Sequence, residues 1–493
     1  MTQIGNIGEM GNGNSGLTEG VGYDGILQNS ESAVKMTAFF DALFSKSCQV
    51  YATMKEKGGV PMNAVELIEK KRDGKALTAA EISWLVENYV KGSVPDYQMA
   101  AWCMAVYFQG MRGEETAALT KAMAASGPRA DLSSIPGIKV DKHSTGGVGD
   151  TVTLAAAPIA AAAGVPIAKM SGRSLGFTGG TADKLASIPG YETEMDFHDF
   201  VAQVKAHGIA MISQSGTMCP ADAMLYALRD TTGTVESLPL IASSIMSKKI
   251  ASGADAIVLD VKCGRGAFMK DRTQAKALMD TMISLGEHAG IKVSALLTDM
   301  NIPLGMAIGN SLEVDEAVEI LGGGGGKRLR TLSLAVAGAM IYAGGRAESY
   351  EEGKSLAASL IASGKAMDKL KECAAAQHGE TAWIGVHPLT PETFAHTVTA
   401  GKDGYVEDID PLILAHTVMA MGGGRSKKDD VIDLHVGVKL LKEAGDPVQA
   451  GDPLLKVYGR AGDDLAALEE RAETAIRIGG KKLDFPLIYE SVV

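Results

Sequence analysis

The segment KHSTGGVGD, residues 142–150, places a lysine, two hydroxyl groups and three glycines directly before a helix that is predicted to begin near Thr151. Its glycines let backbone N–H groups turn toward a ligand, and the start of a helix adds the positive end of the helix dipole. Lys142 adds a full charge, so the segment has the chemistry of a phosphate-binding loop. It lacks the GK[ST] ending of the nucleotide-binding P-loop. Taken alone, it is also compatible with a glycine-rich turn that caps a helix.

A second group of donors follows a predicted strand at 165–170. SGR at 171–173 and TGGT at 178–181 supply hydroxyl, guanidinium and backbone donors. Open α/β sheets bind ligands at the carboxyl ends of their strands, which is where this group is expected to lie. Two donor-rich loops at successive strand ends can converge on one phosphate, and their joint occurrence favours an anion site over a capping turn.

Two predicted helices carry polar side chains that share a face. Tyr226 and Arg229 are three residues apart on the first helix, and Ser244 and Lys248 are four apart on the second. Arginine and lysine can donate to ring oxygens and serine can bond to a ring nitrogen, so these residues could hold a planar ligand rich in carbonyl groups. By spacing alone, an ordinary solvated helix face is the favoured interpretation.

The elements that would position these residues begin with a helical part. Thr78 and Glu81 form a capping box for a helix through Val90, and helices at about 96–110 and 113–126 follow. Farther along, short apolar strands alternate with Ala-rich helices, which predicts a parallel sheet flanked by helices. These strands are predicted at 165–170, 209–212 and 256–261.

Composition limits the class of partner. The chain has 493 residues, 46% of them hydrophobic and 22% charged, which is ordinary for a globular protein of two or three domains. Its net charge is −12 and it has no basic run with interleaved aromatic residues, which argues against nucleic acid. The most apolar stretch, 152–168, is too short and too interrupted by proline to span a bilayer, and no signal peptide is visible. The five scattered cysteines form no CxxC pair, so we expect free thiols and a cytoplasmic protein.

Three long motifs carry a resemblance to a known family. KHSTGGVGDTVTL, followed by SGRSLGFTGGTADKLASIPG, closely resembles the signature of the thymidine and pyrimidine-nucleoside phosphorylases. YALRDTTGTVESLPLIASSIMSKKIASGADAIVLDVK resembles the family's next block, and AMGGGR at 420–425 also matches. GDTVTL and IASSIMSKKI are more similar to the pyrimidine-nucleoside enzymes of Gram-positive bacteria than to strict thymidine phosphorylases. Ser174, Ala186 and Gly233 depart from the usual residues, and none of them removes a ligand-binding side chain.

The resemblance implies an α/β fold, with an all-helical small domain, a large α/β domain with a mostly parallel sheet, and a C-terminal β-rich (α+β) part attached to the large domain. It also implies a homodimer that contacts through the helical domain. The expected bounds are 62–130 plus 221–252 for the helical domain, 131–220 plus 253–380 for the α/β domain, and 381–493 for the C-terminal part.

The resemblance also assigns residues to three subsites. Phosphate would be bound by Lys142, Ser144, Gly146, Thr153, Ser171 and Thr181. The nucleoside would be bound by His143, Leu175, Tyr226, Arg229, Ser244 and Lys248. The catalytic residues would be His143, Lys142, Arg229 and Lys248. The Gram-positive-type enzymes hold a potassium ion at positions that match Gly149, Thr151, Leu304, Ala307 and Glu316.

The activity implied is reversible phosphorolysis of uridine, thymidine or deoxyuridine to free base and (deoxy)ribose 1-phosphate by a single inverting displacement. Phosphate would be the co-substrate, and no organic cofactor is expected. One alternative is a strict thymidine phosphorylase. Another is an anthranilate-type phosphoribosyltransferase, which would need magnesium and an acidic pair that cannot be placed here. A third is a non-catalytic nucleoside-binding protein, against which the full set Lys142, His143, Arg229 and Lys248 argues.

The first 61 residues stand apart, because the resemblance begins at Met62. Residues 1–31 are rich in Gly, Asn, Ser and Glu without periodicity, which is typical of a disordered extension. A short helix is predicted through Phe39–Phe44. An over-extended reading frame is the alternative origin of this segment.

Overall fold

The computed structural model describes residues 62–173, 179–214, 217–390, 395–425, 427, 430–460 and 462–493. Residues 64–493 form one compact unit. The predictions for residues 1–61 and for Leu175 lie outside the described residues. Among the described helices, none combines the length and the apolar character that crossing a membrane requires.

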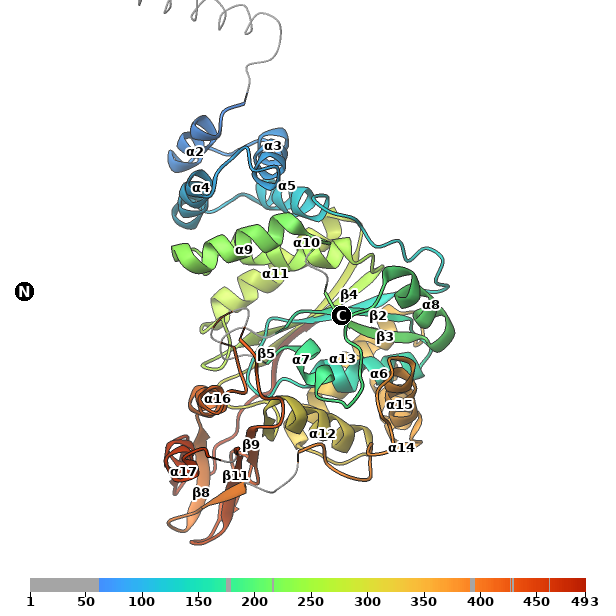
Figure 1. Ribbon diagram of the computed structural model, residues 1–493, viewed down its shortest axis with the longest axis vertical. Coiled ribbons are helices and arrows are strands. Elements are labelled where there is room, and N and C mark those ends of the chain that lie inside the picture. The colour runs from blue at the N-terminus through green and yellow to red at the C-terminus, as the bar shows by residue number, and fades with distance from the viewer. Residues whose placement is uncertain are drawn as a thin grey trace, which may run out of the picture. The chain divides into compact units, whose positions relative to one another are not determined.

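The N-terminal helices pack with two later helices into a helical domain (Figure 1). The predicted capping box is confirmed, because the Thr78 hydroxyl accepts from the Glu81 N–H at 3.3 Å and the Glu81 carboxylate accepts from the Thr78 N–H at 2.6 Å. Leu85, Trp102 and Leu225 share one apolar core, which joins helices from both parts of the chain. The helices are α2 (Ala64–Arg72), α3 (Ala79–Val90), α4 (Asp96–Gln109), α5 (Gly113–Ala124), α9 (Pro220–Thr232) and α10 (Leu238–Ala251).

The central sheet has the strand order β1-β4-β5-β13, in which β1, β4 and β5 are parallel and β13 is antiparallel to β5. The parallel pair β2-β3 lies beside β1, where the Val140 N–H donates to the Pro166 carbonyl at 3.2 Å. The three predicted strands are confirmed as β2, β3 and β4. The strands are β1 (Val140–Ser144), β2 (Ile167–Ser171), β3 (Ile209–Ser213), β4 (Ala256–Cys263), β5 (Lys292–Asp299) and β13 (Ile488–Val492).

Helices cover both faces of this sheet. Val258 of β4 packs into the core formed with α6, α12 and α13, whereas its neighbours Ile257 and Leu259 pack against α10 and α11. Successive side chains of a strand point to opposite faces, so β4 defines a face toward α6 and a face toward α10. The helices of the α/β part are α6 (Val152–Ala162), α7 (Thr181–Ala186), α8 (Phe197–His207), α11 (Arg272–His288), α12 (Asn310–Leu321), α13 (Lys327–Ala343), α14 (Tyr350–Ala362) and α15 (Lys365–Ala376).

The C-terminal part is built from two antiparallel sheets, β6-β9-β11-β7 and β10-β8-β12. Two strands cross the expected boundary at residue 380, because β6 joins a C-terminal sheet and β13 joins the central sheet. Its elements are β6 (Ala307–Ile308), β7 (Ala395–Thr399), β8 (Gly404–Ile409), α16 (Pro411–Ala420), β9 (Gly437–Leu440), β10 (Pro447–Val448), β11 (Pro453–Tyr458), α17 (Leu465–Glu473) and β12 (Ile476–Gly479).

Candidate active site

Successive side chains of strand β1 point alternately to the two faces of the sheet. Its residues 141 and 142 pair in register with Ile257 and Val258. Asp141 and His143 therefore point to the face that α10 covers, and Lys142 points to the face that α6 covers. The sequence pattern predicts residues 142–150 as a single loop, and the structure corrects this by placing the first three of them on β1. Buried polar side chains hide this strand from a search for apolar runs.

The loop after β1 is anchored on the neighbouring strand. The Thr145 N–H donates to the Asp260 carbonyl at 3.1 Å, and the Thr145 hydroxyl accepts from the Lys262 N–H at 2.8 Å. Gly146 and Gly149 adopt φ values of 93° and 67°, a region that glycine enters without steric cost. These contacts and turns bring the loop from β1 to the start of α6.

Lys142 forms the centre of a polar cluster on the α6 face. Its buried ammonium donates to the Thr153 hydroxyl at 3.3 Å and lies 3.6 Å from the Asp260 carboxylate. Burial lowers the pKa of Lys142, while the charges of Asp150 and Asp260 oppose that shift. The Ser144 hydroxyl donates to the Asp150 carboxylate and accepts from the Gly146 N–H at 3.2 Å. The structure therefore brings together four of the six predicted phosphate ligands.

The second predicted loop approaches the first from β2. Ser171, the last residue of β2, has a buried hydroxyl with no hydrogen-bond partner among the described residues. Thr181 is the first residue of α7, and Lys184 of the same helix donates to the Asp150 carbonyl at 2.7 Å. A buried hydroxyl without a partner carries a desolvation cost that a bound anion would offset.

Five charged residues of this cluster are missed by the sequence analysis. Lys184 lies 2.5 Å from the Glu313 carboxylate, and Lys262 lies 2.7 Å from Asp260 and 3.9 Å from Asp150. Burial alone would raise the pKa of Asp150, but the charges of Lys262, Lys142 and Lys184 outweigh it and hold that pKa well below its usual range. The cluster therefore balances three ammonium groups against three carboxylates. The signal that could have found it is the pair of charges inside the apolar strand IVLDVK at 257–262.

The opposite group of predicted residues lies on α9 and α10. Lys248 donates to the Ser244 hydroxyl at 3.0 Å and to the Asp222 carboxylate at 2.5 Å. Asp222 was not predicted, and it orients the ammonium from the first turn of α9. Tyr226 is 38% exposed on the same helix. A cation, a hydroxyl and an aromatic ring are thus available to a planar ligand.

Arg229, which the sequence predicts to bind the nucleoside, donates hydrogen bonds to backbone carbonyls in the structure. Its buried guanidinium donates to the carbonyls of Thr234, Val235 and Leu240 at 2.5–3.2 Å. It therefore ties the segment after α9 to the first turn of α10 through three of its five N–H groups, which leaves two for a ligand.

His143 lies between the two groups. Burial lowers the pKa of its imidazole well below 6.5, and the charges of Lys249, Lys169, Lys248 and Lys142 lower it further. The imidazole is therefore neutral at pH 7, with one N–H to donate.

The residues matched to the potassium site also converge. The Gly149 carbonyl accepts from the Gly305 N–H at 3.1 Å, and the Glu316 carboxylate accepts from the N–H groups of Met306 and Ala307 at 2.7 and 3.0 Å. Thr151 instead donates its hydroxyl to Glu313 at 3.0 Å. No cluster of three His, Cys, Asp or Glu side chains suited to a metal occurs in the described part of the chain. Any cation here would thus be held largely by backbone oxygens.

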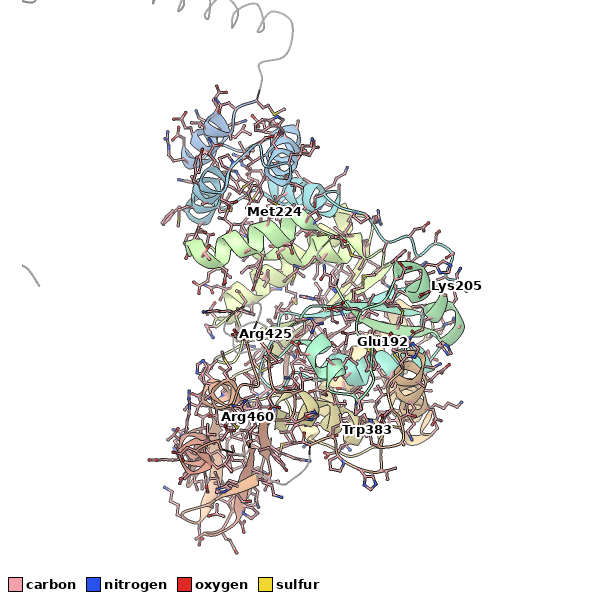
Figure 2. The ribbon with its side chains drawn as sticks, viewed as in Figure 1. Glu192, Lys205, Met224, Trp383, Arg425 and Arg460 are labelled. Atoms are coloured by element: carbon pink, nitrogen blue, oxygen red, sulfur yellow. The ribbon has the colours of Figure 1, made fainter. Side chains whose placement is uncertain are left out.

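One residue of the C-terminal part reaches this site. Arg425, which Figure 2 labels, forms an ion pair of 2.7 Å with the buried Asp183 of α7. Arg173 approaches the same carboxylate at 3.5 Å. The AMGGGR motif thus ends on a contact with the helix that begins at Thr181, a predicted phosphate ligand.

A donor-rich cluster at the end of a parallel strand, opposed by a cation on a helical domain, is the arrangement expected of a group-transfer enzyme that binds an anion. Comparison with known proteins agrees. Residues 65–127 match the glycosyl transferase family helical bundle domain, 137–367 its a/b domain, and 405–479 the pyrimidine nucleoside phosphorylase C-terminal domain. The chain belongs to the pyrimidine-nucleoside phosphorylase family of glycosyltransferases.

The similarity to individual relatives extends over almost all of their length. The chain is 48% identical to pyrimidine-nucleoside phosphorylase from Geobacillus stearothermophilus over 433 residues, which cover 87% of this chain and 100% of that protein. It is 47% identical to the pyrimidine-nucleoside phosphorylase of Staphylococcus aureus strain MSSA476 over 434 residues, covering 88% and 100%. The crystal structure of anthranilate phosphoribosyltransferase from Thermus thermophilus superposes with a TM-score of 0.52 at 22% identity, covering 64% of this chain and 99% of that one. The last comparison shows a shared fold.

Proposed function

We propose that this chain catalyses the reversible phosphorolysis of uridine, thymidine and deoxyuridine to the free pyrimidine and a pentose 1-phosphate. The observation that carries this proposal is the position of β1. Its Lys142 belongs to the polar cluster on the α6 face, and its His143 faces α10, the helix that bears Lys248. Phosphate and base would then occupy opposite sides of one sugar.

Phosphate is bound on the α6 side by Lys142, Ser144, Gly146, Thr153, Ser171 and Thr181. The net charge of the cluster is balanced, so affinity for the dianion comes from directed donors and from the N-terminal end of α6. Bound there, phosphate attacks C1′ while the bond to the base breaks, and the developing oxocarbenium ion is stabilised by the charge of the dianion. The displacement is direct and needs no covalent intermediate on the enzyme.

The departing base is stabilised from the α10 side. Negative charge develops on its ring nitrogen and carbonyl oxygens as the glycosidic bond breaks. Lys248, Ser244 and the two remaining N–H groups of Arg229 donate to those atoms, and Tyr226 packs beside the nucleoside. The neutral His143 donates a hydrogen bond from the strand side without transferring a full proton. One such donor contributes about 3 kcal/mol of transition-state stabilisation.

The proposed potassium ion would lie between the first loop and β6. Burial raises the pKa of Glu316 to about 8 even though its carboxylate accepts two backbone N–H bonds. A monovalent cation beside it would favour the ionised carboxylate over the neutral form that burial favours, with the carbonyls of Gly149, Leu304 and Ala307 and the Thr151 hydroxyl as further ligands. When bound, the ion would fix the loop and would take no part in the bond changes.

The helical domain offers a surface for a second copy of the chain. Tyr97, Met104, Tyr107 and Phe108 are exposed on α4, and Tyr97 and Phe108 are 74% and 76% exposed. Exposed apolar groups of this kind mark interfaces. We therefore assign the homodimer contact to this face. Sedimentation of Phe108→Lys should give monomers while Val431→Lys, changed at a 98% exposed site, stays dimeric.

A cytoplasmic location accords with the cysteines. All four that the structure describes are free and buried, which suits a reducing compartment.

The test of the main activity is phosphate-dependent release of uracil or thymine, followed by absorbance. We expect turnover with inorganic phosphate and none when phosphate is omitted. Turnover of base only in the presence of phosphoribosyl pyrophosphate and magnesium would establish a phosphoribosyltransferase instead. Nucleoside binding without turnover would establish a non-catalytic binding protein.

A further inference from the structure

A buried ion cluster replaces the hydrogen-bond ladder between β1 and β2. These strands belong to different sheets, although the Val140 N–H bonds to the Pro166 carbonyl where they begin. Beyond that point Lys169 of β2 extends its ammonium to Asp141 at 3.1 Å and to the Lys142 carbonyl at 2.7 Å. The Asp141 carboxylate in turn accepts from the Lys142 N–H at 2.8 Å. Side chains thus hold the backbone of Lys142 on the side where none of the described strands pairs with it.

The same carboxylate reaches the helical domain. Its second oxygen accepts from the ammonium of Lys249 on α10 at 2.8 Å. Lys249 follows Lys248, whose ammonium points instead to Asp222 and Ser244. Neighbouring residues of a helix project about 100° apart, so α10 offers one side to the base and the next side to β1.

Two adjacent pairs of residues are therefore joined at this point. Asp141 precedes Lys142, which serves phosphate, and Lys249 follows Lys248, which serves the base. The Asp141–Lys249 ion pair thus links β1 to α10 at positions directly next to the two substrate lysines. Both partners are almost fully buried, with side chains 1% and 7% exposed.

Stability alone explains this cluster poorly. A buried ion pair often contributes less to folding than well-packed apolar side chains of the same volume. A cluster that fixes geometry, in contrast, has a clear use where two substrates bind to different domains and must meet. Displacement of reacting groups by about 1 Å can lower the rate about 100-fold.

We propose that Asp141, Lys169 and Lys249 are positioning residues that set the separation between the phosphate-side Lys142 and the base-side Lys248 in the ternary complex. This inference rests on the proposed phosphorolysis. Lys169 donates to Asp141 and to the carbonyls of Lys142 and Met170, and Lys249 donates to Asp141, so both ammonium groups are directed at β1 and β2 and away from the two subsites proposed for the substrates. Their effect on the separation of Lys142 and Lys248 is exerted through β1 and α10.

The test compares Lys249→Met with Lys249→Arg in the full chain. The Met variant removes the charge and keeps much of the volume, whereas the Arg variant keeps a donor for Asp141. Lys205→Met, at an exposed position of α8, is the matched control. Steady-state kcat and KM are measured for both substrates, and binary binding of phosphate and of uridine is measured by calorimetry.

We expect Lys249→Met to lower kcat about 10- to 100-fold while each binary affinity stays close to that of the wild type. Lys249→Arg should recover most of the lost kcat, and Lys205→Met should behave as the wild type. Unchanged kcat in Lys249→Met would overturn the inference. Equal weakening of both binary affinities together with a lower Tm would also overturn it, because that result describes a purely structural pair.

A second variant covers the case in which Lys249→Met does not fold. Asp141→Asn keeps an acceptor for Lys169 and places an amide against Lys249. It should show the same split between kcat and binary affinity, and adding Lys249→Arg to it should not restore kcat. A wild-type kcat in Asp141→Asn would refute the role of the cluster. An inactive wild-type enzyme would refute the phosphorolysis itself, so the two failures are distinguishable.

Discussion

Arg425 and Asp183 are joined by an ion pair of 2.7 Å, although 242 positions separate them in the chain. Asp183 belongs to the short helix that begins at Thr181, a predicted phosphate ligand. Arg425 follows α16 in the C-terminal part, which therefore supports the phosphate-side helix directly. We therefore expect this contact to influence phosphate binding.

We expect Arg425→Ala to raise the KM for phosphate about 10-fold, because one buried charged hydrogen bond holds α7 in place. The KM for uridine should change much less. Arg460→Ala is the control, since Arg460, labelled in Figure 2, is a half-exposed arginine of the same part that pairs with Asp463. Equal effects of the two substitutions on phosphate would show that Arg425 has no special role.

Lys142→Ala should fold and lose at least about 100-fold in kcat/KM for phosphate, the usual effect of removing a donor that faces a developing charge. We expect this loss because the Lys142 ammonium is buried between Thr153 and Asp260, in the cluster that is proposed to bind phosphate. Calorimetry with phosphate alone separates lost binding from lost turnover. Lys205→Ala should retain wild-type values. If the Lys142 variant binds phosphate normally, Lys142 lies outside the phosphate subsite.

Local pattern was sufficient for much of this architecture. The capping box of Thr78 and Glu81 and the apolar strands β2, β3 and β4 depend on residues close in sequence, and each was correctly predicted. The spacing of Ser244 and Lys248 likewise placed them in contact, because residues four apart on a helix are neighbours.

Contacts between distant segments could not be predicted in this way. Asp222 pairs with Lys248, and Asp183 with Arg425, only because the tertiary fold brings them together. Strand β1 was hidden for a related reason: Asp141 and Lys142 are buried by pairing with other charges, so the strand lacks the apolar alternation that marks a buried segment.

Arg229→Ala should raise the KM for nucleoside about 10-fold and also lower Tm, with little change in phosphate affinity. Both effects follow from its position, because the guanidinium holds the carbonyls of Thr234 and Val235 before α10 and that of Leu240 in the first turn of α10. Each such bond to a charged group contributes about 1.5–3 kcal/mol. Asp230→Ala, on the exposed side of the same helix, is the control. A loss of Tm without any change in nucleoside KM would make Arg229 a structural residue only.

Potassium should stabilise the folded enzyme through Glu316. Replacing potassium chloride by tetramethylammonium chloride at equal ionic strength should lower Tm by a few degrees. This shift corresponds to about 1 kcal/mol of stabilisation of the folded state by the bound ion. Glu316→Gln should remove this difference, and Glu319→Gln, at a more exposed site on the same helix, should preserve it. Identical melting curves of the wild type in the two salts would contradict a potassium site.

The histidine at the centre of the site leads to a prediction about pH. Burial and the charges of Lys249 and Lys169 hold the pKa of His143 well below 6.5 in the folded enzyme. In the unfolded chain its pKa returns to about 6.5. Below that pH the unfolded state therefore binds more protons than the folded state, and the free energy of unfolding falls as pH falls.

His143→Asn should remove this contribution to the pH dependence of stability. As the pH is lowered from 7 to 5, the free energy of unfolding of the variant minus that of the wild type should rise by about 1–2 kcal/mol. Each pH unit contributes up to about 1.4 kcal/mol to this difference. Above pH 7 the difference between the two proteins should be constant. His198→Asn, at a solvent-exposed histidine of α8, should leave the slope unchanged. Denaturant unfolding at fixed ionic strength gives the free energy of unfolding of all three proteins at each pH. Parallel plots of this free energy against pH for the wild type and His143→Asn would mean that His143 titrates normally in the folded enzyme and is protonated below pH 6.5.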